Sequence, residues 1–258
     1  MDQTTIFLSA LGVGLGGFLA LWPVSLIVRD ASIVDVWWGP GIFCALALAW
    51  FLAGAPTHPR ALLLLAIVGA WSLRLGFVML RRRARHGAED RRYQEMRARF
   101  GAGFWWKSLI VIFLLQGTLQ WIIGLAAYSG VISPAPLGLA GVLGALLAFA
   151  GLAIEARSDQ ELDRFKRVAA PDALLTSGLR AHVRHPSYAG EIILWWGVWL
   201  LTAGAGAWWT LISPVLLTFL LLKVSGAPIA ADGLRRTKTG YAEWAARTPA
   251  FLPWRRGG

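Results

Sequence analysis

Residues 184–191 place a dense set of polar and charged groups, Arg-His-Pro-Ser-Tyr-Ala-Gly-Glu, directly before the apolar run Ile192–Leu201. Pro186 suits the first turn of a helix, where unpaired N–H groups and the positive end of the dipole attract phosphate. Arg184 adds a bidentate phosphate donor, and Glu191 lies one turn further in, where it can accept from a ribose hydroxyl. A capped helix with a snorkelling arginine would not need all of these groups. The segment therefore predicts a site for an anionic cofactor at the mouth of a membrane helix.

Two further ionisable residues fall at the margins of apolar runs. Arg74 lies about six residues before the end of its run. It is close enough to the interface to snorkel, but ionisable groups at that depth more often line a cavity. Asp35 opens another run. Among apolar neighbours its carboxyl group favours the protonated form, which can donate a hydrogen bond, and an acidic charge favoured by a helix dipole explains it equally well.

Composition indicates a membrane protein. The chain has 258 residues, is 57% hydrophobic and contains 15 Trp, which is far more apolar than an ordinary soluble domain. Several runs reach about 20 residues, the length that crosses a bilayer core, and they are continuously apolar rather than alternating. We therefore predict an all-α polytopic bundle, a single membrane-embedded domain over residues 1–258. About seven spans are expected, near Ile6–Val28, Val34–Gly54, Ala61–Leu80, Ser108–Tyr128, Leu137–Glu155, Ala189–Thr202 and Ala207–Lys223.

The charge distribution supports this layout. With seven spans, 23 of the 25 Lys and Arg fall on one face, and only Arg60 and Arg74 are exceptions. The positive-inside rule makes that face cytoplasmic. The same rule explains most of the net charge of +11, and because the basic residues are interleaved with spans, nucleic-acid binding is not expected.

The two long basic loops are expected to be structured. Charges spaced four apart predict a short helix around Arg91–Arg99. The spacing of Glu155, Asp159 and Asp163 predicts that the fifth span continues as a polar helix until Ser177-Gly178 breaks it.

Some familiar patterns are rejected. Residues 12–17 read Gly-Val-Gly-Leu-Gly-Gly, but they lie inside a span, where glycines favour close helix packing rather than a nucleotide site. The histidines lack metal-ligand spacing, the single Cys44 allows no intrachain disulfide, and no serine-hydrolase motif is present. We predict no metal.

Five motifs together resemble the bacterial branch of the steroid 5-alpha-reductase family, from about Asp35 to Tyr241. They are Trp71-Ser-Leu-Arg-Leu-Gly76, Glu89-Asp-Arg-Arg-Tyr93, Asp159-Gln160, Gly178-Leu179 through Arg184–Glu191, and Ser225-Gly-Ala-Pro228. The resemblance implies a bundle of seven spans in the bacterial inner membrane, with NADPH held by cytosolic loops. It implies reduction of a carbon–carbon double bond conjugated to a ketone, in a lipophilic, steroid-like substrate taken from the lipid bilayer. A monomer is expected.

Site residues follow from the matched motifs. Asp35 lies where animal members carry the glutamate that binds the ketone, and Trp71 falls near the partner tyrosine, so the resemblance makes both catalytic. The positions that match or adjoin dinucleotide contacts, or lie in the matched motifs, are Arg74, Arg92, Tyr93, Asp159, Arg164, Arg184, His185, Ser187, Tyr188, Glu191 and Tyr241. Ser187 replaces the usual asparagine, and Ala230-Ala231 replaces a glutamate that often follows the last motif.

A second reading stays open. The Arg-His-Pro-x-Tyr-x-Gly-Glu motif and the C-terminal tyrosine region also resemble isoprenylcysteine carboxyl methyltransferases, which use S-adenosylmethionine. The additional N-terminal spans and the basic surroundings favour a phosphate-rich cofactor instead.

Overall fold

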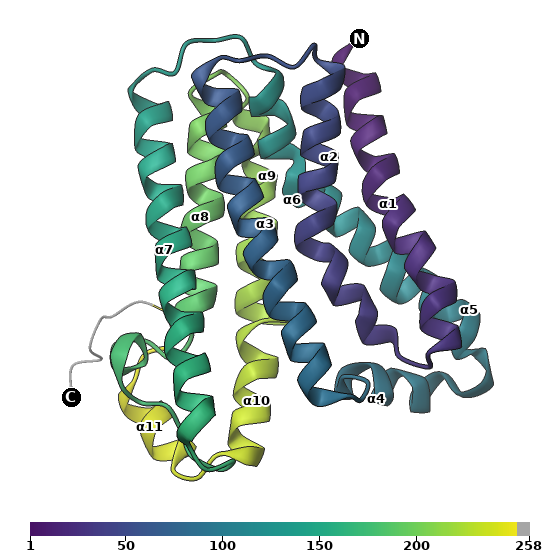
Figure 1. The fold of residues 1–258 in the computed structure, drawn as a ribbon, viewed down its shortest axis with the longest axis vertical. Coiled ribbons are helices and arrows are strands. Elements are labelled where there is room, and N and C mark those ends of the chain that lie inside the picture. Colours follow the sequence, from purple (N-terminus) through teal and green to yellow (C-terminus); the bar gives the residue numbers. More distant parts are fainter. Residues whose placement is uncertain (252–258) are drawn as a thin grey trace. The chain divides into compact units, whose positions relative to one another are not determined.

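The computed structural model describes residues 1–251, apart from the side chains of Arg85 and His86, and all regular structure within that part is helical (Figure 1). The predicted all-α class is confirmed. Six helical stretches are long and apolar enough to cross a membrane: Gln3–Ile27, Ala31–Leu52, Pro59–Ala84, Arg91–Ile132, Leu139–Val168 and Trp208–Thr237. The remaining predicted span forms α8 (Pro186–Ala203), whose first six residues belong to the polar 184–191 segment.

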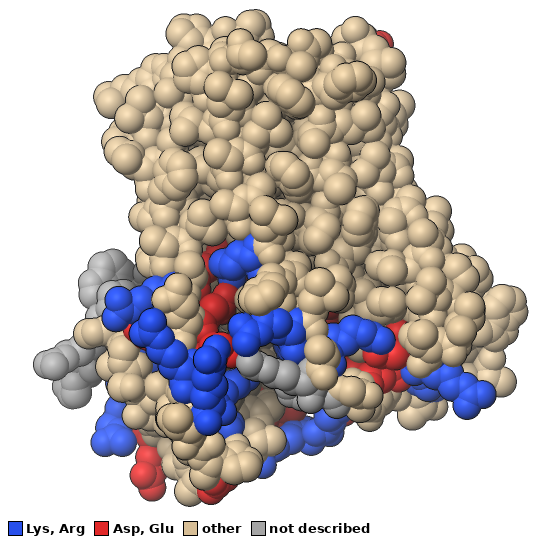
Figure 2. All heavy atoms as spheres, in the orientation of Figure 1, with Lys and Arg blue, Asp and Glu red and all other residues tan. Residues whose placement is uncertain are grey.

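Contacts along the chain divide it into two compact units. Unit 1 comprises residues 1–141 and 202–210, and unit 2 comprises residues 142–201 and 211–258. In each unit taken by itself, Lys and Arg gather toward one end (Figure 2). This agrees with the predicted segregation of charge.

Unit 1 is built around α2 (Trp38–Leu52), which packs against α1 (Gln3–Ile27), α3 (Pro59–His86) and α6 (Leu115–Ile132). A 3-10 segment, η1 (Ala31–Trp37), leads into α2. The predicted charged helix is confirmed as α4 (Arg91–Phe100), which lies across the end of α3 (Figure 1). The 3-10 turn η2 (Gly101–Gly103), α5 (Phe104–Ser108) and the π-helical η3 (Leu109–Leu114) connect α4 to α6.

The glycines of α1 illustrate what the sequence could and could not specify. A Cβ at Gly17 would lie 2.1 Å from the ring of Trp37, and one at Gly14 would lie 3.1 Å from Oε1 of Gln120. Gly12 and Gly16 have open space instead. The predicted close packing is therefore made by Gly14 and Gly17, and not by Gly12 or Gly16.

Unit 2 contains α7 (Leu139–Val168), η4 (Gly178–Ala181), α8, α9 (Ile212–Phe219), the π-helical η6 (Leu220–Val224), α10 (Ala227–Thr237) and α11 (Tyr241–Arg247). A further 3-10 turn, η5 (Trp208–Leu211), precedes α9. The prediction that α7 extends beyond its apolar part is confirmed, but its expected end at Ser177-Gly178 is wrong. The helix ends at Val168, because Pro171 cannot donate a helical hydrogen bond and disfavours helical geometry in the residue before it.

Four glycines bring α7 and α8 into close contact. Gly144 and Gly151 on α7 face Gly197 and Gly190 on α8, and each pair is spaced by seven residues. A Cβ at Gly190 would lie 2.7 Å from the carbonyl oxygen of Gly151. Small residues let membrane helices approach at backbone distance. The glycine of the 184–191 segment therefore fixes the start of α8 against α7, which determines where the polar residues around it lie.

Candidate functional site

The predicted site residues separate into one polar cluster in each unit. Unit 1 holds Asp35, Trp71, Arg74, Arg92 and Tyr93. Unit 2 holds the rest: Asp159, Arg164, Arg184, His185, Ser187, Tyr188, Glu191 and Tyr241.

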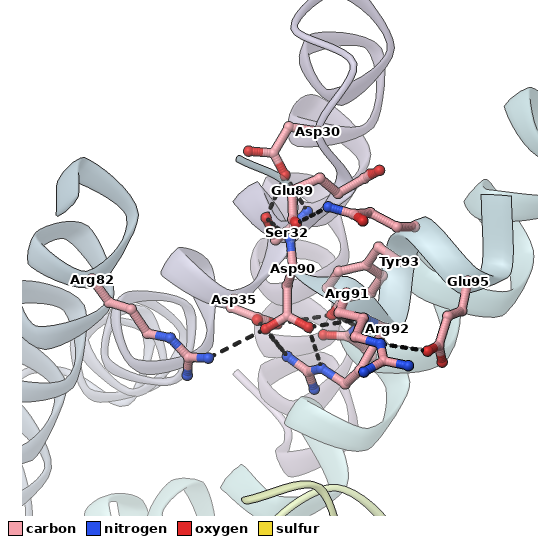
Figure 3. Close-up of polar contacts among 12 residues, drawn as sticks. Asp30, Ser32, Asp35, Arg82, Glu89, Asp90, Arg91, Arg92, Tyr93 and Glu95 are labelled. Carbon is pink, nitrogen blue, oxygen red and sulfur yellow. Dashed lines mark hydrogen bonds and ion pairs between the residues drawn. The ribbon is translucent and has the colours of Figure 1, made fainter. Parts of the chain in front are cut away.

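In unit 1, the Asp35 carboxylate is held by two side chains from the start of α4. Tyr93 Oη donates to Oδ1 at 2.9 Å, and Arg92 Nη2 donates to Oδ2 at 3.0 Å (Figure 3). Tyr93 is 3% exposed and lies in an apolar core with Phe18, Val34 and Phe113. Because that core fixes the tyrosine ring, the position of its hydroxyl group is determined by packing as well as by hydrogen bonding.

A chain of hydrogen bonds continues from Tyr93 into the bundle. Gln116 Nε2 donates to Tyr93 Oη at 3.1 Å, and Gln116 Oε1 accepts from Trp38 Nε1 at 2.7 Å. Tyr93 Oη therefore receives one hydrogen bond and directs its own proton at Asp35. Sequence reasoning missed Gln116, although a polar amide inside the apolar run 109–125 is a usable signal for a buried hydrogen bond.

On the other side of Asp35, Arg92 is shared with a second carboxylate. Arg92 Nε donates to Asp90 Oδ1 at 2.9 Å, and Arg82 Nη2 donates to Asp90 Oδ2 at 3.3 Å (Figure 3). The hydrogen bonds and the positive charge of Arg92 help to hold the pKa of Asp90 below its ordinary value, although burial opposes them. We call the connected set the Asp35 network: Trp38, Gln116, Tyr93, Asp35, Arg92, Asp90 and Arg82.

Neighbouring carboxylates in unit 1 are also paired. Asp30 accepts from Arg83, and Glu89 accepts from Arg97 at 2.8 Å and from the backbone N–H of Ala31 at 2.8 Å. Asp30, Asp35, Glu89 and Asp90 thus each have an arginine partner. Both ends of α4 and the η1 turn are tied together by these bonds, which holds the Asp35 network in place.

The other two predicted residues of unit 1 lie on α3. Trp71 is 2% exposed and belongs to the buried core, and Arg74 is half-buried one turn further along. The tyrosine that the structure places against Asp35 is Tyr93. The predicted catalytic role of Trp71 and the predicted cofactor role of Arg74 stay predictions.

In unit 2, a polar cluster surrounds the start of α8. Ser187 Oγ lies within hydrogen-bond distance of two acceptors on α7, Ser158 Oγ at 2.9 Å and Asp159 Oδ1 at 3.2 Å. This contact depends on the glycine-mediated approach of the two helices. We call this set the α8 head cluster: Ser158, Asp159, Arg180, Arg184, His185, Ser187, Tyr188 and Tyr241.

His185 is the residue before the first turn of α8, and its backbone carbonyl accepts from the N–H of Ala189 at 3.0 Å. Its ring stacks on Tyr188 at 5.8 Å between centroids and contacts Phe251 at 5.6 Å. Burial, together with the charges of Arg180 and Arg184, lowers the pKa of His185 to about 4. The imidazole is therefore neutral at pH 7, so the positive charge of this cluster comes from its arginines.

Arginine and tyrosine donors in the cluster have spare capacity. Arg180 Nη1 donates to the carbonyl oxygen of Arg184 at 3.2 Å, whereas Arg180 Nε, Arg184 Nε and Tyr241 Oη are buried without a hydrogen-bond partner among the described residues. Burial lowers the pKa of the Arg180 guanidinium, although the nearby Tyr188, Asp159 and Tyr241 oppose that shift. Arg180 was missed by sequence reasoning, although it stands four residues before Arg184.

The segment after α11 packs against the approach to α8. The N–H groups of Arg184 and His185 donate to the carbonyl oxygens of Pro249 and Ala250 at 2.9 and 3.1 Å. Tyr241, the first residue of α11, is 2% exposed and lies 5.8 Å from Trp244 between ring centroids. The long-range bonds explain how a C-terminal tyrosine joins a site built around α8. A depression of about 460 Å³ lies beside this packing, lined by Thr176, Ala181, His182, Trp244, Arg247, Thr248 and Pro249.

The two other predicted residues of unit 2 lie on α7 and α8. Arg164 is exposed on α7, and Glu191 is half-buried on α8, one residue after the glycine that contacts α7. Their cofactor roles stay predictions. No group of three His, Cys, Asp or Glu side chains that could hold a metal ion occurs in the part of the chain that the structure describes.

Residues 21–248 match a family described as a protein of unknown function, DUF1295. The chain belongs to this family. The family is related to the steroid 5-alpha-reductases, which agrees at that coarse level with the resemblance in the motifs. No curated protein and no solved structure matches the chain.

Proposed function

We propose that this DUF1295 protein is a membrane reductase that uses NADPH to reduce a carbon–carbon double bond conjugated to a ketone in a lipophilic, steroid-like substrate. The observation that carries the proposal is the α8 head cluster. Buried donors of Arg180, Arg184 and Tyr241 have no partner among the described residues, at the N-terminus of a helix. Leaving buried donors unpaired is costly, and a polyanionic ligand would satisfy them.

The residues of the cluster fit a dinucleotide chemically. Arg180 and Arg184 would bind phosphate oxygens, for which the planar guanidinium group is well suited. Asp159 and Ser187, hydrogen-bonded to each other, would accept from and donate to ribose hydroxyl groups. Tyr241 would donate its buried hydroxyl proton. The neutral His185 adds no charge, so it contributes a stacking surface and fixes the chain before α8.

The Asp35 network would hold the carbonyl oxygen of the substrate. When bound, NADPH would supply the hydride that forms a C–H bond at the β-carbon and would itself be oxidised to NADP+. The electrons of the double bond would move onto the carbonyl oxygen, where Asp35 in its protonated form would donate a hydrogen bond to the developing enolate. Tyr93 would hold Asp35 in position, and Arg92 would stabilise the negative charge. Proton transfer to the α-carbon from solvent then completes the saturated ketone. We assign Arg92 and Tyr93 to this carbonyl-binding role, in place of cofactor binding.

The proposal includes a location. The apolar helices would place the protein in the bacterial inner membrane as a multi-pass monomer, with its basic loops in the cytoplasm, where NADPH is available. The substrate would be taken from the bilayer.

Thermal unfolding of the detergent-purified full chain with NADPH, NADH or S-adenosylmethionine tests the cofactor. A ligand at 100 times its dissociation constant stabilises a protein by about 2.7 kcal/mol. We expect stabilisation by NADPH, followed by NADPH oxidation when a 3-oxo-4-ene steroid is added. Stabilisation by S-adenosylmethionine alone would instead indicate the methyltransferase reading.

A further inference from the structure

A second candidate site lies in unit 1, at the end of α1. It is a depression of about 400 Å³, lined by Leu26, Arg29, Arg97, Gly101, Ala102, Phe104 and Trp105. Its walls combine two guanidinium groups with apolar and aromatic side chains. A lining of that kind suits a ligand with an anionic head and a hydrocarbon tail.

Arg29 occupies a position that ordinarily belongs to glycine. The N–H of Asp30 donates to the carbonyl oxygen of Ser25 at 3.0 Å, five residues back, which closes α1 in a Schellman motif with Arg29 in the left-handed region at φ 53°. A side chain in that conformation costs backbone energy that glycine would not. The geometry projects an exposed arginine at the end of the helix, and Arg29 makes no salt bridge or hydrogen bond with any residue that the structure describes.

Arg97 forms the second basic wall. Its guanidinium carbon lies 4.1 Å from the ring centroid of Phe104, and its Nε and Nη2 donate to Glu89. A guanidinium group has five N–H donors, so three remain beyond the two that Glu89 accepts. Since Glu89 neutralises Arg97, the net positive charge of the depression comes from Arg29.

The surroundings have the composition of a lipid–water interface. Trp22 Nε1 donates to the carbonyl oxygen of Trp105 at 3.0 Å and holds α5 against α1. Trp105 and Trp106 remain 58% and 45% exposed, and Ile27 beside Arg29 is 81% exposed. Tryptophan rings concentrate at the level of lipid headgroups, and basic pockets at the cytoplasmic ends of membrane helices bind anionic headgroups.

We propose that this depression binds the headgroup of an anionic phospholipid. The phosphate would lie at Arg29 and at the remaining donors of Arg97, and an acyl chain would lie against Leu26 and Trp105. The inference is independent of the proposed reductase activity, because it rests on groups that the α8 head cluster does not include and it is tested without NADPH or steroid.

The probes are dioleoyl phosphatidylglycerol and dioleoyl phosphatidylcholine, added at equal mole fraction to the full chain in detergent, and inorganic phosphate. We expect phosphatidylglycerol to raise the melting temperature and to be retained in native mass spectra, with a much smaller effect of phosphatidylcholine or phosphate. Equal effects of the two lipids, or a phosphate effect as large as that of phosphatidylglycerol, would overturn the assignment to an anionic lipid.

Arg29→Gly is the decisive variant, because glycine removes the charge and suits the left-handed backbone, so folding is preserved. It should weaken phosphatidylglycerol binding by about fivefold, the effect of one arginine near an anionic surface. Arg29→Lys should retain most of the binding. Arg99→Gln, which removes an exposed arginine outside the depression, should change nothing. Unchanged binding by a folded Arg29→Gly, or an equal loss in Arg99→Gln, would contradict the proposal.

Discussion

The two polar clusters of this protein differ in how their charges are satisfied. Around the Asp35 network, four carboxylates are each paired with an arginine, and Tyr93 both accepts and donates. In the α8 head cluster, buried donors of Arg180, Arg184 and Tyr241 have no partner among the described residues. A closed set of ion pairs fixes the geometry of its members, whereas a set with spare donors favours an added anion. Under the proposed function, the closed set of ion pairs suits the positioning of a carbonyl group, and the set with spare donors suits the binding of a cofactor.

Variants of the Asp35 network should have the largest effect on activity. Asp35→Asn and Tyr93→Phe each remove one member of the hydrogen-bonded pair, and we expect turnover of a 3-oxo-4-ene steroid to fall by about 10²–10⁴-fold. NADPH binding, measured by thermal shift, should be retained. Asp163→Asn, which disrupts a surface pair with Arg167, is the matched control. Full turnover by Asp35→Asn would end the catalytic assignment of this residue.

A variant of the α8 head cluster should change the affinity for NADPH rather than the turnover rate. Arg184→Ala removes a donor group for phosphate, and we expect the NADPH dissociation constant to rise by roughly 10–100-fold, the value of a hydrogen bond to a charged group. Titration calorimetry measures the change. Arg167→Ala, which removes an arginine in the last turn of α7 that is paired with Asp163, should bind as the unaltered protein does. If both variants bound equally well, the spare donors of the α8 head cluster would have another purpose.

The packing of α7 against α8, which supports the α8 head cluster, can be tested separately. Gly190→Ala places a methyl group 2.7 Å from the Gly151 carbonyl oxygen and 2.9 Å from the Glu155 nitrogen, so α8 must move away from α7. We expect a loss of about 1–3 kcal/mol in the free energy of unfolding. The bond between Ser187 and Asp159 should be lost with it. Gly12→Ala on α1 meets open space and should be tolerated. Equal stability of the two variants would show that the close approach of α7 and α8 is not required.

The smallest effect concerns pH. His185 has a pKa of about 4 in the folded chain, below its ordinary value near 6.5, so the unfolded chain binds the extra proton between these values. As far as this group is concerned, the free energy of unfolding is highest above pH 6.5 and falls as the pH decreases toward 4. At pH 5 it is about 2 kcal/mol lower than at neutral pH. Unfolding of wild type and His185→Gln at pH 7.5 and pH 5 measures the difference. A pH dependence that His185→Gln leaves unaltered would assign it to other groups.

Much of the architecture could be predicted because hydrophobicity alone determines it. Runs of about 20 apolar residues must form helices in lipid, since the bilayer offers no other partner for backbone groups. The helix α4 and the extension of α7 were predictable from a different signal, the spacing of charges by four residues. The site was predictable only in part. The segment 184–191 could be recognised by its density of polar groups, whereas no local pattern distinguishes Gln116 or Arg180 from other polar residues.

By itself, the sequence determined the helical class, the ends where charge collects and the residues able to bind phosphate, because transfer free energies and helix geometry act locally along the chain. Only the tertiary structure decided which of these groups form hydrogen bonds with one another. Tyr93 reaches Asp35 across 58 positions because a buried aromatic core folds α4 over η1, and Gly151 and Gly190 let Ser187 reach Asp159. Such partnerships depend on packing between distant segments, which no local pattern encodes.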